Sequence, residues 1–112
     1  MRPFAWLMGV PWDEAARVGS LLGEKTILNE FIAYKHLGEF TKSPNPLSAR
    51  STIIATYALC GFANLSSIAL QLGGISGIAP SRRGEIAALG IKAMIAGTFA
   101  SFVTANIAGM LL

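Results

Sequence analysis

The sequence predicts an all-α membrane protein with a re-entrant helical hairpin, a discontinuous transmembrane helix and a final transmembrane helix. Hydrophobic residues make up 53% of the 112 residues and charged residues only 13%, whereas soluble domains average about 25% charged residues. Residues 52–80 contain no charged residue, and neither do residues 93–112. Because a bilayer core of ~30 Å needs about 20 helical residues, both stretches are candidate membrane spans.

Residues 1–12 are apolar and are interrupted by Pro3 and Pro11. Trp6 and Trp12 suit the headgroup boundary of a membrane, where tryptophan is enriched. This segment is therefore expected to be an interfacial approach to the membrane.

Residues 13–34 contain two short helical stretches, with a tight turn expected between Gly19 and Gly23. Each stretch has roughly 10 residues and would be about 15 Å long, which is half a bilayer. The pattern predicts a re-entrant hairpin whose tip lies near the membrane midplane. An amphipathic helix pair on the membrane surface fits the same pattern.

Residues 35–50 are expected to form a loop, because they combine charges with Gly38, Pro44 and Pro46. Residues 51–79 then predict a transmembrane helix that is broken near Gly61, since glycine and polar residues in mid-span are typical of discontinuous helices. Tight helix packing through small residues would explain the same glycines. After a charged connection, residues 86–112 predict the last transmembrane helix.

Glu30 is the most informative polar residue, because its neighbours in the sequence are apolar. A carboxylate at membrane depth costs about 2.5 kcal/mol or more unless it is paired or hydrated. Such a residue indicates a ligand contact or a polar pathway. The alternative is an ion pair with Lys25 or Lys35 near the interface.

Three further residues in the broken span are candidates for the same site. Asn64 and Ser67 lie three apart and share a helix face, while a break near Gly61 would bring the Phe62 ring toward the same cavity. Amide, hydroxyl and carboxylate groups together suit neutral ligands rich in hydroxyl groups, and an aromatic ring supplies a flat apolar wall.

Several kinds of site are excluded by composition. The nine basic residues are scattered, so the basic face that a nucleic-acid-binding protein needs is missing. Neither a disulfide framework nor a metal site built on cysteines can form, because the chain has a single cysteine. Nothing in the sequence indicates a metal site, a covalently bound cofactor or an enzyme.

The chain resembles the C-terminal region of the concentrative nucleoside transporter family. The resemblance is carried in order by residues 19–23 (GSLLG), 29–34 (NEFIAY), 58–67 (ALCGFANLSS), 79–83 (APSRR) and 89–93 (LGIKA). It covers nearly the whole chain, and the spacing between the motifs also agrees.

This resemblance implies a symporter that moves a nucleoside with Na⁺ or H⁺ by secondary active transport. Glu30 and Asn64 correspond to ligands of the ribose hydroxyls, Ser67 lies beside them, and Phe62 corresponds to a ring that lines the nucleobase. The family implies a homotrimer and a multi-pass location in the bacterial inner membrane, in contact with lipid.

The family's transporters are several times longer than this chain, which is therefore expected to be a fragment. The missing N-terminal half would hold most of the coupling-ion site and the residues that read the base. The alternative is a small membrane protein that does not transport and only packs against partner helices.

Overall fold

The computed structural model describes all residues, Met1–Leu112, and all its regular elements are helices. In chain order these are α1 (Arg2–Leu7), α2 (Ala15–Ile27), α3 (Glu30–Lys42), α4 (Ala49–Leu59), α5 (Leu65–Ile78), the 3-10 helix η1 (Pro80–Arg82) and α6 (Arg83–Leu111). The all-α prediction is confirmed.

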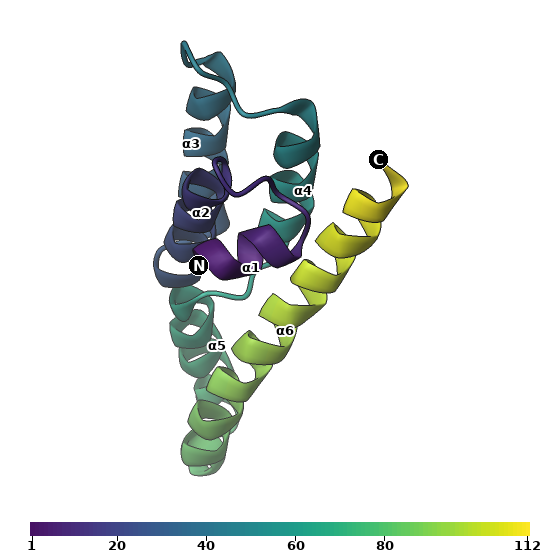
Figure 1. The fold of residues 1–112 in the computed structure, drawn as a ribbon. Helices are drawn as coiled ribbons and strands as arrows, with labels where there is room; N and C mark the ends of the chain where they lie inside the picture. Colours follow the sequence, from purple (N-terminus) through teal and green to yellow (C-terminus); the bar gives the residue numbers. More distant parts are fainter.

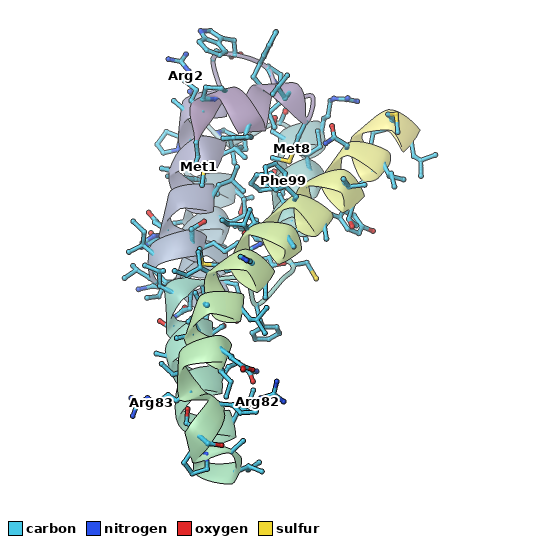
Figure 2. The ribbon with its side chains drawn as sticks, turned by 90° about the horizontal axis from the view of Figure 1, so that it is seen from below. Met1, Arg2, Met8, Arg82, Arg83 and Phe99 are labelled. Atoms are coloured by element: carbon cyan, nitrogen blue, oxygen red, sulfur yellow. The ribbon has the colours of Figure 1, made fainter.

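The molecule is elongated and measures 52 × 25 × 19 Å along its principal axes. Helices α2, α3 and α4 lie together at one end, and α5 pairs with the first part of α6 at the other end (Figure 1). Helix α6 runs diagonally along most of the molecule and packs against both α5 and α4. The paired residues Arg82 and Arg83 lie far from Arg2 (Figure 2).

The buried core is small and is formed by residues of α1, α2, α3, α4 and α6, together with a few from the connections. It includes Ala5, Leu21, Ile54, Phe102 and Ala105. Helix α5 has no buried residue, and only 11% of the most apolar window of the Pro80–Leu111 helix is buried. Much of the apolar surface of both helices is therefore free to contact lipid or further helices.

Within residues 1–12, which were predicted to approach the membrane at its interface, residues 2–7 form helix α1. The Arg2 guanidinium donates to the Trp12 carbonyl at 3.0 Å and lies 4.1 Å from the centroid of the Trp12 ring. The Trp6 and Trp12 rings meet edge to face with their centroids 6.1 Å apart. These contacts join the start and the end of the N-terminal segment.

The predicted turn between Gly19 and Gly23 is wrong, because α2 continues through both glycines to Ile27. Gly19 serves close packing: a Cβ at this position would lie 2.7 Å from the Arg2 backbone nitrogen. The hairpin turns instead at Leu28 and Asn29. Asn29 is extended, and its side-chain oxygen accepts from the Ile32 N–H, which starts α3.

The loop is shorter than the predicted residues 35–50. Helix α3 continues through Gly38 to Lys42, so the connection to α4 covers residues 43–48. Pro44 and Pro46 prevent the helix from continuing. Ser48 then begins α4 by accepting a hydrogen bond from the Ser51 N–H.

The break in the apolar stretch of residues 52–80 is found where it was predicted. Helix α4 ends at Leu59 and α5 begins at Leu65. Gly61 lies in the break against the Ser101 hydroxyl, and a Cβ at Gly61 would overlap that oxygen. The glycine-rich residues 73–77 remain helical.

The last helix starts at Arg83, three residues before the predicted start at 86. Pro80 opens η1, and Arg82 forms an ion pair with Glu85 at 2.6 Å. The 32-residue stretch Pro80–Leu111, with a mean hydropathy of 1.8 over its best window, is the one helix that is long and apolar enough to cross a membrane.

Candidate functional site

The candidate site lies where the hairpin tip meets the break between α4 and α5. Glu30 is the first residue of α3, and Asn64 is the last residue before α5. The Asn64 side-chain nitrogen donates to Oε2 of Glu30 at 2.9 Å. Asn64 is only 2% exposed. Its hydrogen bond with Glu30 therefore lies in a partly buried contact between two segments that are far apart in the sequence.

The orientation of the Asn64 amide follows from its place in the sequence. Asn64 is the N-cap of α5, and its Oδ1 accepts from the Ser67 N–H at 2.8 Å. Asparagine is among the preferred N-cap residues because its oxygen satisfies a free N–H of the first turn. With the oxygen held by the helix, the nitrogen faces Glu30.

The first turn of α5 makes a second contact with the hairpin tip. The Ser66 hydroxyl donates to the Leu28 carbonyl at 3.0 Å. Asn64 and Ser66 together fix the start of α5 against the turn between α2 and α3. Ser66 was not singled out as a site residue from the sequence, because its role depends on the position of the hairpin turn.

The hairpin in turn satisfies the C-terminal end of α4. The Lys25 ammonium donates to the Ala58 carbonyl at 2.9 Å, and the Tyr34 hydroxyl donates to the Thr56 carbonyl at 2.7 Å. The last carbonyls of a helix have no partner within it. Two of these carbonyls are therefore bound by side chains of the hairpin.

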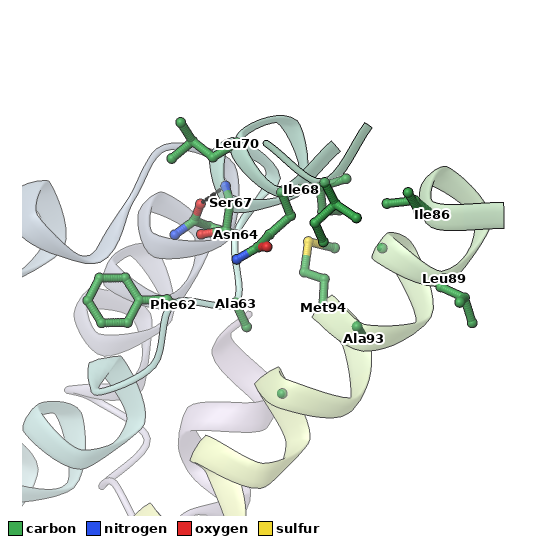
Figure 3. A pocket seen from close by; sticks show the side chains of 14 residues that line it. Phe62, Ala63, Asn64, Ser67, Ile68, Leu70, Ile86, Leu89, Ala93 and Met94 are labelled. Atoms are coloured by element: carbon green, nitrogen blue, oxygen red, sulfur yellow. Dashed lines mark hydrogen bonds between the residues drawn. The ribbon is translucent and has the colours of Figure 1, made fainter. Parts of the chain in front are cut away.

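The site opens into a cavity of about 710 Å³ between α5 and α6. Asn64, Ser67 and Gln71 line its polar side (Figure 3). The remaining lining residues are mostly apolar or small: Phe62, Ala63, Ile68, Leu70, Ile75, Ile86, Leu89, Gly90, Ala93, Met94 and Gly97. A ligand with a polar and an apolar part would match this division.

Three of the four predicted site residues are brought together. Glu30 and Asn64 are hydrogen-bonded, and Ser67 is bonded to Asn64 through its backbone. Phe62 lines the cavity, but its side chain points away from Met94 and is 77% exposed (Figure 3). Nothing in this chain packs over the Phe62 ring.

The sequence left open whether Glu30 forms an ion pair with Lys25 or Lys35. Neither lysine lies within ion-pair distance of Glu30; the two ion pairs in the structure are His36–Glu24 and Arg82–Glu85. Lys35 is exposed. Lys25 is buried and interacts with Glu30 electrostatically without direct contact.

Residues 1–109 match the family described as the Na⁺ dependent nucleoside transporter C-terminus. The chain belongs to this family. The resemblance to concentrative nucleoside transporters is confirmed, and the members it matches are transporters, not enzymes.

Relatives from bacteria and mammals are similar over the same region. The chain is 53% identical to the uncharacterized transporter YutK of Bacillus subtilis over 96% of this chain and 26% of YutK. It is 47% identical to solute carrier family 28 member 3 of Homo sapiens (97% and 18%) and 42% identical to sodium/nucleoside cotransporter 1 of Mus musculus (99% and 19%). The chain thus spans about a quarter or less of these relatives.

Solved structures of the transporter CNTnw have the same fold in this region. The inward-facing, substrate-bound structure matches with a TM-score of 0.91 and 48% identity, over 97% of this chain and 26% of CNTnw. An outward-facing structure also matches with a TM-score of 0.91, at 46% identity and the same coverage. The matched region of CNTnw therefore has broadly the same fold in both states.

Proposed function

We propose that this chain is the C-terminal, substrate-binding portion of an ion-coupled nucleoside symporter, in which Glu30, Asn64 and Ser67 bind the ribose hydroxyls. The observation that carries the proposal is the 2.9 Å hydrogen bond between Asn64 and Glu30 across the hairpin tip and the helix break. It brings together a carboxylate and an amide from two segments that are far apart in the sequence.

The geometry leaves hydrogen-bonding capacity for a sugar. The Asn64 nitrogen uses one N–H on Glu30 and keeps a second, while Oε1 of Glu30 accepts no hydrogen bond within the chain. Two neighbouring ribose hydroxyls can therefore donate to Glu30 and accept from Asn64. The Ser67 hydroxyl adds a group that both donates and accepts.

Phe62 is proposed to pack against the nucleobase. Its ring is exposed at the cavity wall, and an aromatic face favours stacking on a flat ring. The base would lie between Phe62 and residues of the N-terminal part of the transporter.

The remaining features of the proposal concern the whole transporter. The coupling ion is Na⁺ or H⁺, and most of its site lies in the N-terminal part. Coupling requires that the ion and the nucleoside each bind more tightly when the other is present. The transporter is proposed to be a multi-pass homotrimer of the bacterial inner membrane, in contact with lipid. In support, a membrane-length helix is present and the relatives are much longer than this chain.

Uptake by a chimera tests the ribose role. Residues 1–112 replace the matching segment of the mouse sodium/nucleoside cotransporter 1, and uptake of labelled uridine is measured with and without Na⁺. Hydrogen bonds to charged groups contribute about 1.5–3 kcal/mol, so Glu30→Gln should lower kcat/KM about 10- to 100-fold. Glu85→Gln, in the exposed ion pair with Arg82, is the matched control.

Inhibition by 2′,3′-dideoxyuridine tests whether the site recognises the ribose hydroxyls of the nucleoside. With the original Glu30, dideoxyuridine should compete much more weakly than uridine. In the Glu30→Gln chimera the difference should shrink, because the carboxylate that reads the hydroxyls is gone. A difference that stays the same would contradict the ribose role of Glu30, and an active chimera that is indifferent to Glu30→Gln would contradict the proposed site.

A further inference from the structure

Lys25 is the one charged side chain among the buried residues, and it is only 1% exposed. It lies in α2, near the end that leads to the hairpin tip. The ribose-binding proposal gives it no role. A buried ammonium is costly unless nearby groups compensate its charge, so its surroundings indicate what it does.

One hydrogen bond and two neighbouring features define where the ammonium lies. Its Nζ donates to the Ala58 carbonyl at 2.9 Å, in the last turn of α4. A Cβ built on Gly61 would stand 3.5 Å from Nζ, so the ammonium lies against the non-helical break. It also interacts electrostatically with the Glu30 carboxylate.

These surroundings offset part of the cost of burying the charge, which is the dominant effect on this ammonium. The C-terminal end of a helix carries a partial negative charge on its free carbonyls, and here the ammonium binds one of them. The Glu30 carboxylate, beyond ion-pair distance, also favours the charged form of the ammonium. Lys25 therefore binds the end of α4 and lies within the electrostatic influence of the carboxylate that is proposed to bind ribose.

The Lys25–Ala58 and Asn64–Glu30 hydrogen bonds lie on either side of the break between α4 and α5. Lys25 joins the hairpin to α4 just before the break, and Glu30 joins the hairpin to Asn64 just after it. A shift of α4 along the hairpin would change the distance between Glu30 and Asn64. The geometry of the site therefore depends on the first bond.

We propose that Lys25 is a positioning residue for the nucleoside site: its ammonium fixes the C-terminal end of α4 to the hairpin and supplies the counter-charge of Glu30. This inference rests on the function proposed above. Lys25 does not contact the nucleoside. It acts through the relative position of Glu30 and Asn64.

Transport kinetics of the chimera described above test this role. Lys25→Met keeps the apolar stem and removes the charge. It should raise the KM for uridine at least about tenfold, which corresponds to ~1.4 kcal/mol, with a smaller change in the maximal rate. Lys25→Arg keeps the charge and should recover part of the affinity. Lys35→Met, at an exposed lysine of the same hairpin, is the matched control and should leave KM unchanged.

The double variant Lys25→Met with Glu30→Gln separates positioning from folding. If Lys25 supplies the counter-charge of Glu30, the double variant should have a KM close to that of Glu30→Gln alone. If Lys25→Met alone does not reach the membrane, neutralising Glu30 should restore its level, because the carboxylate that has lost its nearby opposite charge is then also removed.

The outcomes distinguish this inference from the proposed function. A chimera that transports and depends on Glu30, but has the same KM in a stable Lys25→Met variant, overturns the role of Lys25 alone. So does an unfolded single variant that Glu30→Gln does not restore. A chimera that is insensitive to Glu30→Gln overturns the proposed function itself.

Discussion

Asn64 makes two hydrogen bonds that serve different purposes. Its oxygen caps α5 through the Ser67 N–H, and its nitrogen binds Glu30. The first bond contributes to the stability of the helix, and the second joins the two residues that are proposed to bind ribose. Substitutions at this residue can separate the two effects.

Asn64→Ser should keep the cap and lose the contact with Glu30, because serine is a good N-cap but its side chain is shorter. Its melting temperature in detergent should stay close to that of the original chain, while the KM for uridine in the chimera rises. Asn64→Ala should lose both, with a further ~1 kcal/mol of stability lost with the cap. Uridine affinity that is unchanged in the serine variant would contradict the pairing with Glu30.

Gly61 allows the break to pass close to α6. Gly61→Ala should destabilise the protein by about 1–3 kcal/mol, as overpacking does, because the new Cβ would overlap the Ser101 hydroxyl. Ser101→Ala removes that oxygen and should restore most of the stability in the double variant. Gly74→Ala is the control, since no atom lies within 4 Å of its Cβ position.

These stabilities are compared by thermal unfolding in detergent. Gly74→Ala should leave the protein as stable as before or slightly more stable, since alanine favours helix more than glycine. If Ser101→Ala failed to rescue Gly61→Ala, a cause other than this contact would be indicated, such as a backbone conformation that alanine disfavours.

At the scale of elements, the hairpin and the broken helix supply hydrogen-bond donors to each other's free backbone carbonyls. Lys25 and Tyr34 bind carbonyls at the end of α4, and Ser66 binds the Leu28 carbonyl at the hairpin tip. Helix ends without such partners are costly in an apolar environment. The hairpin turn and the helix break therefore stabilise each other, because each supplies partners for backbone groups that the other leaves free.

A different contact closes the end of the hairpin that leads to the loop. Before α2 begins, the Glu14 carboxylate accepts from the Ser48 N–H at 3.0 Å and from the Ser48 hydroxyl at 2.8 Å. Burial raises the pKa of Glu14, but hydrogen bonds with Ser51 and Ser48 outweigh it, so the pKa lies below its usual 4.5. The folded state therefore favours the carboxylate.

Glu14→Gln should lower the melting temperature at neutral pH and have little effect in acid. A lowered folded-state pKa contributes stability that is fully present above the unfolded pKa and is lost as pH falls through the folded pKa. Melting curves of both forms between pH 7 and pH 3 should converge toward the acid end. A difference that is constant with pH would show that the charge of Glu14 does not contribute.

At the scale of the whole molecule, the apolar surface far exceeds what this chain can bury by itself. Helix α6 has 29 residues and is about 44 Å long at 1.5 Å per residue. This exceeds a bilayer core of ~30 Å, so the helix would cross at a tilt or extend beyond the core. The cavity between α5 and α6 has walls from only these two helices and the break.

Expression of the chain with and without the N-terminal part of a relative tests this incompleteness. Alone, the chain should enter membranes without catalysing uridine uptake, because a cavity with half of its walls cannot alternate its access. Together with residues of YutK that precede the matched region, it should restore uptake. Absence of uptake in both cases, with both parts present in the membrane, would favour a protein that only packs against other helices.

The fold was largely predictable from the sequence, because long apolar stretches and glycines near polar residues have direct physical meaning. The break near Gly61 and the grouping of Glu30 with Asn64 in one site follow from such local features and from the family resemblance, whereas the hydrogen bond between the two side chains was not predicted. The turn of the hairpin was misplaced, since Gly19 was interpreted as a turn residue when it serves the approach of α1. Local sequence does not show which of these two uses a glycine has.

By itself, the sequence determined that the chain is helical, belongs in a membrane and carries polar residues within its apolar spans. These properties depend on composition and on the residue types at particular positions. Only the tertiary structure decided that Lys25 is buried against Ala58 and that Ser66 binds the hairpin tip. The physical reason is that free helix ends accept any suitable donor nearby, and only the packing of the helices determines which side chain comes within reach.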